Sequence, residues 1–204
     1  MNVAGRAVRL LAAAGLAANL LVGPALAGPA PGPTAASASA LSHIRIDNFG
    51  QVSPVYFRGA QPEGRDYADL AAAGIKTVID LQADGPVGEK SLVEGAGMSF
   101  HRISMTTRTA PTGDQIETFL QLVNDPVNQP VYVHCAGGRH RTGVMTAIYR
   151  MSGDGWTPEK AFQEMKQYKF GADFLHPEFK RFVYAYQAAP SAPAVKAAIA
   201  TVHQ

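Results

Sequence analysis

The chain has 204 residues, with 18 Lys and Arg against 16 Asp and Glu and a formal net charge of +2. This length is enough for one domain with its own hydrophobic core. The near balance of charges excludes the strong basic excess that is typical of nucleic-acid-binding proteins, so we expect no nucleic acid partner.

The first 27 residues have the pattern of a secretory signal peptide. Arg6 and Arg9 precede an apolar run of 13 residues at positions 10–22, and the tripeptide ALA at 25–27 offers a small-x-small cleavage site. A membrane span needs about 20 apolar residues, so an uncleaved anchor is the weaker alternative. We therefore expect an exported protein, periplasmic or secreted, without stable insertion in a membrane.

Composition also sets the expected domain boundaries. Residues 28–41 are rich in Pro, Ala, Gly and Ser, which is typical of a flexible leader. Residues 189–204 begin with a second Ala- and Pro-rich stretch and are interpreted as a C-terminal tail. No internal repeat interrupts the sequence between them, so we expect a single domain at 42–188.

Within that domain, strand and helix patterns alternate along the chain. The patterns predict strands at 55–58, 76–81, 99–103 and 131–133, and helices at 66–73, 89–96, 114–124, 142–152, 158–168 and from 177 onward. Alternation of this kind favours a single α/β domain with a central, mostly parallel sheet of about four to five strands flanked by helices.

The chain contains one cysteine, Cys135, between the strand at 131–133 and the helix that begins near 142. Exported proteins usually pair their cysteines in disulfides, and a single thiol has no internal partner. Such a thiol is either a buried, inert side chain or a reactive one. The residues around Cys135 indicate which of these two kinds of thiol it is.

The segment HCAGGRHRTG at 134–143 has the composition of an anion-binding loop. A loop that leads from a strand into a helix points successive backbone N–H groups inward. Gly137 and Gly138 admit strained backbone angles, and Arg141 can offer two parallel donors to phosphate oxygens. Nearby cations and a helix N-terminus lower the pKa of a thiol, so Cys135 is predicted to be a nucleophile aimed at phosphorus.

The pattern His-Cys-x5-Arg-Thr-Gly resembles the signature loop of the cysteine-dependent protein tyrosine phosphatase superfamily, in its small dual-specificity branch. Segments 56–62 (YFRGAQP), 73–81 (AGIKTVIDL) and 147–151 (AIYRM) are similar to stretches of exported bacterial members. Residues 139–143 (RHRTG) are also similar to the fungal and plant atypical dual-specificity phosphatases. The resemblance spans about residues 44–187 and implies a phosphatase fold and a phosphocysteine intermediate.

The predicted site follows from this loop. Cys135 is expected to be the nucleophile, Arg141 to bind the phosphate, and Thr142 to donate its hydroxyl to the thiolate, while His134 is expected to bond the backbone. Arg58 is expected to contact substrate or to hold the loop, and pairing with a nearby acid is the equal alternative. The other residues expected to bind substrate are Ala136, Gly137, Gly138, Arg139 and His140.

Such chemistry needs a general acid, usually an aspartate from a loop before the signature strand. Asp114 is the first choice, although it also stands where a helix cap or first-turn residue belongs. Asp84, after the strand at 76–81, is the second candidate, and Asp80 is expected to be structural.

The resulting function is a metal-independent phosphomonoesterase without a cofactor, acting first on phosphotyrosine in proteins. Arg139 and His140 add charge beyond what one phosphate needs, so an inositol polyphosphate or phosphoinositide is the alternative substrate. A catalytically weak phosphate-binding module is the second alternative. Since His101, His140 and His176 lack metal-ligand spacing, no metal is expected, and the oligomeric state stays open.

Overall fold

The structure, a computed structural model, describes residues 41–188. The expected signal peptide at 1–27, residues 28–40 of the expected leader and the expected tail at 189–204 lie outside the described residues. Within the described part of the chain, no helix is long and apolar enough to cross a membrane.

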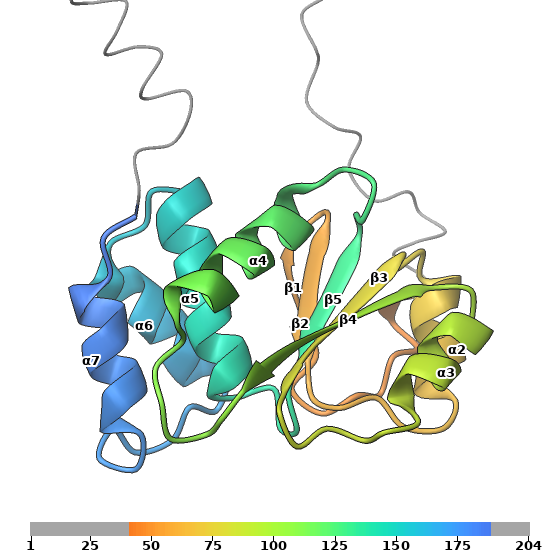
Figure 1. Cartoon of the computed structure of the whole chain (residues 1–204), viewed down its shortest axis with the longest axis horizontal. Helices are drawn as coiled ribbons and strands as arrows, with labels where there is room; N and C mark the ends of the chain where they lie inside the picture. The colour runs from red at the N-terminus through yellow and green to blue at the C-terminus, as the bar shows by residue number, and fades with distance from the viewer. Residues whose placement is uncertain (1–40, 189–204) are drawn as a thin grey trace, which may run out of the picture. The chain divides into compact units, whose positions relative to one another are not determined.

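A five-stranded sheet forms the centre of the described domain (Figure 1). Neighbouring strands are parallel except for the antiparallel first pair, which confirms the predicted mostly parallel sheet. The strand that the sequence does not predict is the first, GQVS, which has a single strongly apolar side chain. In the spatial order β1-β2-β5-β3-β4, the strands are β1 (Gly50–Ser53), β2 (Tyr56–Gly59), β5 (Val131–His134), β3 (Thr77–Gln82) and β4 (Ser99–Met105).

Within residues 41–188, six helices cover the two faces of this sheet, with α2 and α3 on one side and α4 to α7 on the other (Figure 1). Their bounds agree with the predicted ones to within one residue. The helices are α2 (Asp66–Ala72), α3 (Glu89–Gly95), α4 (Gly113–Asn124), α5 (Arg141–Gly153), α6 (Pro158–Gln167) and α7 (Pro177–Ala185).

Two hydrophobic cores result, because successive side chains of a strand point to opposite faces of the sheet. Val131 and Val133 of β5 belong to the larger core beneath α4 to α7. Tyr132, between them, belongs to the smaller core with Leu70 of α2 and Val93 of α3. All four residues of β5 are buried, as expected for a central parallel strand covered on both faces.

The topology brings two loops to one edge of the sheet. Strands β3 and β5 are parallel neighbours, with Asp80 opposite His134, so both strands end at the same edge. Cys135 directly follows β5, and Asp84 follows β3 two residues after its end. Helix α5 begins at Arg141 and points its N-terminus at the same edge. This edge is where the sheet positions the predicted site.

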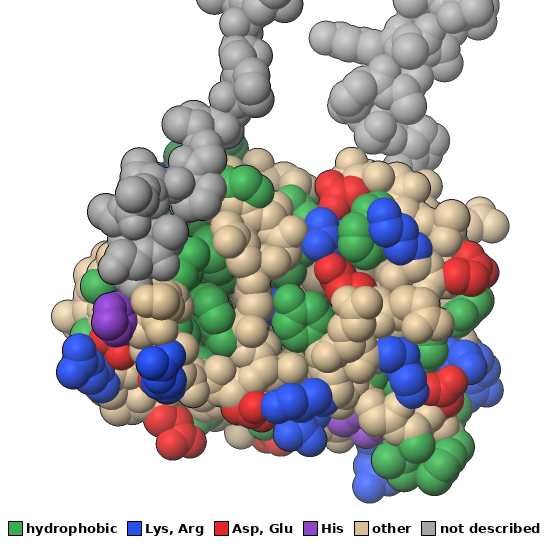
Figure 2. Space-filling model, turned by 180° about the vertical axis from the view of Figure 1, so that it is seen from behind, with side chains coloured by type: hydrophobic (Ala, Val, Ile, Leu, Met, Phe, Trp, Pro, Cys, Tyr) green, Lys and Arg blue, Asp and Glu red, His purple; other side chains and the backbone are tan. Residues whose placement is uncertain are grey.

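The face of the domain in Figure 2 carries basic and acidic side chains interspersed with one another. This distribution agrees with the near balance of charge in the sequence. On this face, no large region carries charge of a single sign.

We predict that Phe119→Ala lowers the free energy of unfolding by about 3–5 kcal/mol, the usual cost of emptying a buried aromatic site. Phe119 is fully buried on α4, and its ring meets Tyr56 of β2 edge-on at a centroid distance of 6.3 Å. Urea unfolding measures the change. Val87→Ala is the control, because Val87 is 96% exposed and its truncation should change stability by less than about 0.5 kcal/mol. Equal stability of both variants would contradict the packing described here.

Candidate active site

Cys135 and Arg141 meet at one pocket. The pocket has a volume of about 230 Å³ and is lined by the loop from Cys135 to Arg141 and by Thr107 from the β4–α4 connection. The lining includes Ala136, Gly137, Arg139 and His140, four of the residues expected to bind substrate. A strand, a six-residue turn and a helix N-terminus thus form the anion-binding arrangement that the sequence predicts.

Gly138 is required by the backbone of this loop. Its φ is +62°, in the left-handed region that favours glycine. A Cβ atom there would lie 2.3 Å from the carbonyl carbon and oxygen of Gly59, at the end of β2. The loop can approach β2 this closely only because residue 138 has no side chain.

Two side chains, one fully buried and one partly buried, donate hydrogen bonds to the carbonyl oxygen of Gly138. Arg58 Nη2 donates to it at 2.6 Å, and its guanidinium stacks 4.0 Å from the centre of the Tyr168 ring. Asn48 Nδ2 donates to the same oxygen at 2.8 Å and to the Tyr168 carbonyl at 2.9 Å. Arg58 is fully buried and does not line the Cys135 pocket. Of its expected roles, its hydrogen bond to the loop agrees with holding the loop, and it forms no ion pair with an acid among the described residues.

Sequence reasoning missed Asn48. Its one local signal is the residue type, because asparagine tolerates positive φ better than most residues, and Asn48 has a φ of +58°. Its partners lie about 90 and 120 positions further along the chain, so no short motif contains them.

The loop favours the thiolate form of Cys135. Burial of the thiol raises its pKa, but the Thr142 hydroxyl and N–H, the charge of Arg141 and the Arg139 N–H together outweigh burial. The net result is a pKa below the ordinary value for cysteine. Among the described residues the Thr142 hydroxyl has no other hydrogen-bond partner, so it is available to the sulfur.

Arg141 is paired with Asp84. Its Nη1 donates to Asp84 Oδ1 at 2.8 Å and to the Met105 carbonyl at 3.2 Å. The hydrogen bond from Arg141 holds the pKa of Asp84 below its usual value. The Arg141 side chain is 4% exposed whereas that of Asp84 is 73% exposed, so the carboxylate is the partner that is free to move.

Asp114 lies in the first turn of α4, is exposed and does not line the Cys135 pocket. The cap of that helix is Thr112, which forms a reciprocal capping box with Gln115. Capping therefore does not depend on Asp114. The structure brings Cys135 and Arg141 to one pocket and pairs Asp84 with Arg141, while neither Asp84 nor Asp114 lines that pocket.

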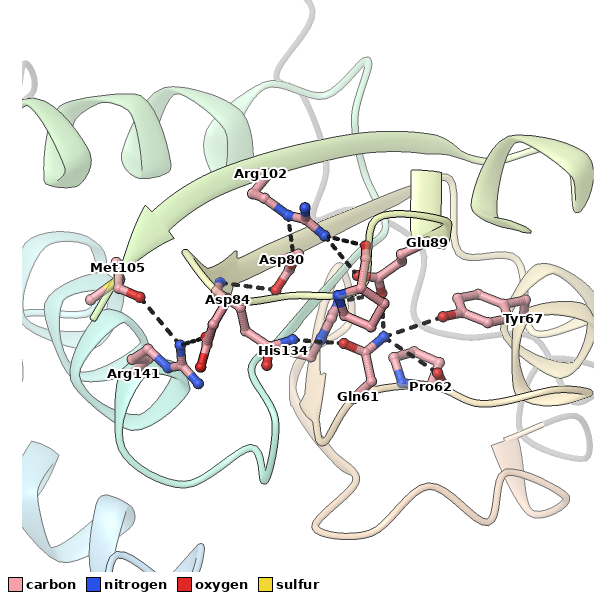
Figure 3. A network of polar contacts seen from close by, with 12 residues as sticks. Gln61, Pro62, Tyr67, Asp80, Asp84, Glu89, Arg102, Met105, His134 and Arg141 are labelled. Atoms are coloured by element: carbon pink, nitrogen blue, oxygen red, sulfur yellow. Dashed lines mark hydrogen bonds and ion pairs between the residues drawn. The ribbon is translucent and has the colours of Figure 1, made fainter. Parts of the chain in front are cut away.

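His134, directly before the cysteine, has a different partner from the expected backbone. It is fully buried, and its Nε2 lies 3.0 Å from Glu89 Oε1, at the start of α3 (Figure 3). Glu89 also accepts from Gln61 and lies 3.5 Å from Arg102. The expectation of backbone bonding is therefore corrected, since a buried carboxylate from another element faces the imidazole.

Asp80 completes this buried network. It accepts from Arg102 Nε at 2.7 Å and from the Gln82 N–H at 2.9 Å, which agrees with its expected structural role. Asp80, Glu89 and His134 could in geometry hold a metal ion. The guanidinium of Arg102 already contacts both carboxylates and compensates their charge, so we interpret the cluster as a structural ion-pair network.

The two extra basic residues of the loop are engaged within the protein. Arg139 Nη2 lies 3.5 Å from Asp47 Oδ2, in a half-exposed ion pair. His140 Nε2 is 2.9 Å from the Phe170 carbonyl, and its ring lies 3.7 Å from that of His176. Burial and the neighbouring His176 lower the pKa of His140, which favours its neutral form.

A buried thiol of lowered pKa and an arginine that line the same loop pocket are the defining features of a cysteine-dependent phosphatase. Residues 43–180 match the family model described as "DSP-PTPase phosphatase fused to NAD+ Kinase". The chain belongs to this family of dual-specificity-type protein tyrosine phosphatases.

Named relatives agree with this assignment. The dual specificity protein phosphatase TpbA of Pseudomonas aeruginosa is 30% identical over 167 residues, covering 80% of this chain and 73% of TpbA. The inositol diphosphatase SIW14 of Saccharomyces cerevisiae is 23% identical over 133 residues, 62% of this chain and 47% of SIW14.

Solved structures of both relatives share the fold. The catalytic core of S. cerevisiae SIW14 superposes with a TM-score of 0.62 at 21% identity, covering 76% of this chain and 94% of that one. P. aeruginosa TpbA superposes with a TM-score of 0.60 at 24% identity, covering 69% and 86%. At these identities the structures support the fold and leave the substrate open.

We predict that iodoacetamide alkylates Cys135 with a pH midpoint below the value of about 8.5 for an ordinary thiol. Below its pKa a thiol is protonated and unreactive, so a lowered pKa extends the reactivity to lower pH. Thr142→Val removes the hydroxyl and should move the midpoint upward. Because the chain has one cysteine, mass spectrometry reads this site alone.

Thr118→Val is the matched control, since Thr118 is exposed on α4 and does not line the pocket. It should leave the midpoint unchanged. A wild-type midpoint at or above that of a free thiol would contradict the stabilisation of the thiolate by the loop.

Proposed function

We propose that the protein is a phosphatase for phosphotyrosine in proteins, which uses Cys135 as nucleophile and needs neither a metal nor a cofactor. The observation that carries the proposal is the convergence of the Cys135 thiol and the Arg141 guanidinium on one loop pocket. The similarity to TpbA, named a dual specificity protein phosphatase, supports the same class of substrate.

The reaction proceeds in two steps at Cys135 Sγ. The thiolate attacks phosphorus, the P–O bond to the substrate breaks, and the leaving oxygen takes a proton from a carboxylic acid, which gives phosphocysteine. Water then attacks phosphorus and gives a proton to the same carboxylate, and the P–S bond breaks. Inorganic phosphate leaves and the thiolate is restored, stabilised by Thr142 and by the charge of Arg141.

Asp84 is the proposed acid, in preference to Asp114. Neither carboxylate lines the Cys135 pocket, but Asp84 accepts a hydrogen bond from Arg141, whereas Asp114 has no hydrogen bond or ion pair with the loop. The pKa of Asp84 is low while Arg141 donates to it. A substrate phosphate that takes over the Arg141 donors removes this stabilisation and adds negative charge nearby. Both changes raise the pKa of the carboxyl group and allow it to carry the proton.

A polyphosphorylated inositol is the second candidate substrate, because SIW14 is named an inositol diphosphatase. The contacts of Arg139 and His140 weigh against it. Arg139 is paired with Asp47, and His140 faces the Phe170 carbonyl, so neither is free to receive a second phosphate without losing a partner. The proposed order of substrates is therefore phosphotyrosine first and inositol phosphates second.

Export is part of the proposal and rests on the N-terminal pattern of the sequence. Arg6, Arg9, the apolar run at 10–22 and the tripeptide at 25–27 support cleavage by a signal peptidase. Substrates would then be phosphoproteins of the periplasm or of the exterior.

We predict that Cys135→Ser reduces hydrolysis of p-nitrophenyl phosphate below about 1% of wild type, because loss of a nucleophile removes several orders of magnitude in rate. Binding of a phosphate analogue such as tungstate should persist, since the backbone cradle and Arg141 are unchanged. Isothermal calorimetry measures this binding. Residual turnover well above this level would argue against a phosphocysteine. A wild-type protein that binds tungstate without turnover would be a phosphate-binding module.

The acid is tested with a matched pair of variants, Asp84→Asn and Asp114→Asn. Loss of the acid should lower kcat about 100-fold for phenyl phosphate, a poor leaving group, and much less for p-nitrophenyl phosphate. It should also flatten the basic limb of the pH profile. We expect this pattern for Asp84→Asn and changes below about twofold for Asp114→Asn. The reverse result would assign the proton to Asp114.

A further inference from the structure

A second pocket adjoins the catalytic one. It has a volume of about 420 Å³ and shares Ala136, Gly137 and Arg139 with the Cys135 pocket. The remaining walls come from two segments, 45–47 before β1 and 60–66 after β2. Any substrate larger than a single phosphorylated residue therefore has a formed depression beside the phosphate.

Arg139 separates the two pockets. It lines both, and a Cβ atom on Gly137 would lie 3.3 Å from Arg139 Nε, so the side chain lies over Gly137. Asp47 holds it there at 3.5 Å and also binds Lys169. The charge of Asp47 is thus compensated by cations within the protein.

The wall formed by the segment after β2 carries carboxylates whose negative charge is less compensated by neighbouring cations. Glu63 and Asp66 both line the pocket. Asp66 Oδ2 accepts the Glu63 N–H at 2.9 Å, and within residues 41–188 the Glu63 carboxylate has no hydrogen bond or ion pair. With Asp47, the lining has three acidic side chains against Arg45 and Arg139. A cation is favoured in such a pocket and a second anion is disfavoured.

We propose that this pocket receives the substrate residue next to phosphotyrosine and selects lysine or arginine there over glutamate or aspartate. The inference rests on the proposed phosphotyrosine specificity and adds the sequence context that the enzyme prefers. Glu63 and Asp66 are the specificity-determining residues. The carboxylates also oppose a ring that carries several phosphates, because a second phosphate would meet them beside the cradle.

The test uses the full chain and synthetic phosphotyrosine peptides that differ only at the two positions flanking the phosphotyrosine, with Lys, Ala or Glu there. Exposed ion pairs are weak, so we expect kcat/KM to be about fivefold higher for Lys than for Glu, with Ala between. Raising the salt to 0.5 M should reduce the ratio, because exposed charges are screened.

Variants of the pocket then test whether the ratio of kcat/KM for Lys and Glu peptides depends on its carboxylates. Glu63→Gln with Asp66→Asn and, separately, Glu63→Lys each make the lining more positive by two charges, so each should bring the Lys-to-Glu ratio to one or below. Asp66 also accepts a backbone N–H, so Glu63→Gln alone is made as well, with a partial effect expected. The matched control is Glu159→Gln, an exposed carboxylate in the first turn of α6 outside both pockets, and it should keep the wild-type ratio.

Turnover of p-nitrophenyl phosphate by each variant is measured in parallel. It distinguishes a failure of the proposed phosphatase function from a failure of the proposed subsite alone. A wild type that hydrolyses neither this compound nor the peptides overturns the proposed function. Hydrolysis of the aryl phosphate with equal rates on Lys and Glu peptides, or with a preference for Glu, overturns the subsite alone. A Lys preference that survives loss of Glu63 and Asp66 places the selectivity elsewhere and overturns it too.

Discussion

The chemistry of this protein depends on the position of one carbonyl group. The Gly138 oxygen accepts hydrogen bonds from Arg58 and Asn48, both of which reach it from outside the loop. These bonds turn the carbonyl toward the protein interior, so the loop can present N–H groups and Arg141 to the opposite side. A loop that binds a dianion must keep its own oxygens away from the ligand, and the two donors meet this requirement.

Arg58 also places a buried positive charge close to the nucleophile. Burial lowers the pKa of Arg58, while the charge of nearby Cys135 opposes that change. The same interaction seen from the sulfur favours the thiolate. The guanidinium that supports the loop therefore also interacts electrostatically with the thiol, while Thr142, Arg141 and the Arg139 N–H account for the lowered pKa of Cys135.

Local patterns predicted the parts of the site that are close in sequence. Cys135, its two neighbouring glycines and Arg141 all lie within the seven positions 135–141. The strand and helix periodicities on either side place this segment on a loop. The helix bounds were equally accessible, because each amphipathic repeat lies within one segment. Fold class followed from the alternation of these elements.

Long-range contacts were beyond such patterns. Asp84 and Arg141 are 57 residues apart, and their pairing depends on which strands are neighbours and where each strand ends. The meeting of His134 with Glu89 needs the same information, since Glu89 resembles an ordinary first-turn helix residue in the sequence. Asp114 ranked first by its place between β4 and β5, and only the path of the chain reveals that its side chain is not at the pocket.

The pairing of Arg141 with Asp84 gives the site an internal competitor. An incoming phosphate group has to displace an exposed carboxylate from the arginine before both donors can turn to it. This replacement of Asp84 by a phosphate at Arg141 costs free energy, so it lowers the affinity of the site for substrate phosphates. It lowers the affinity for the product, inorganic phosphate, in the same way. In a turnover cycle Asp84 would return to the arginine as inorganic phosphate leaves, so an arrangement of this kind would lower the affinity for substrate and ease the release of product.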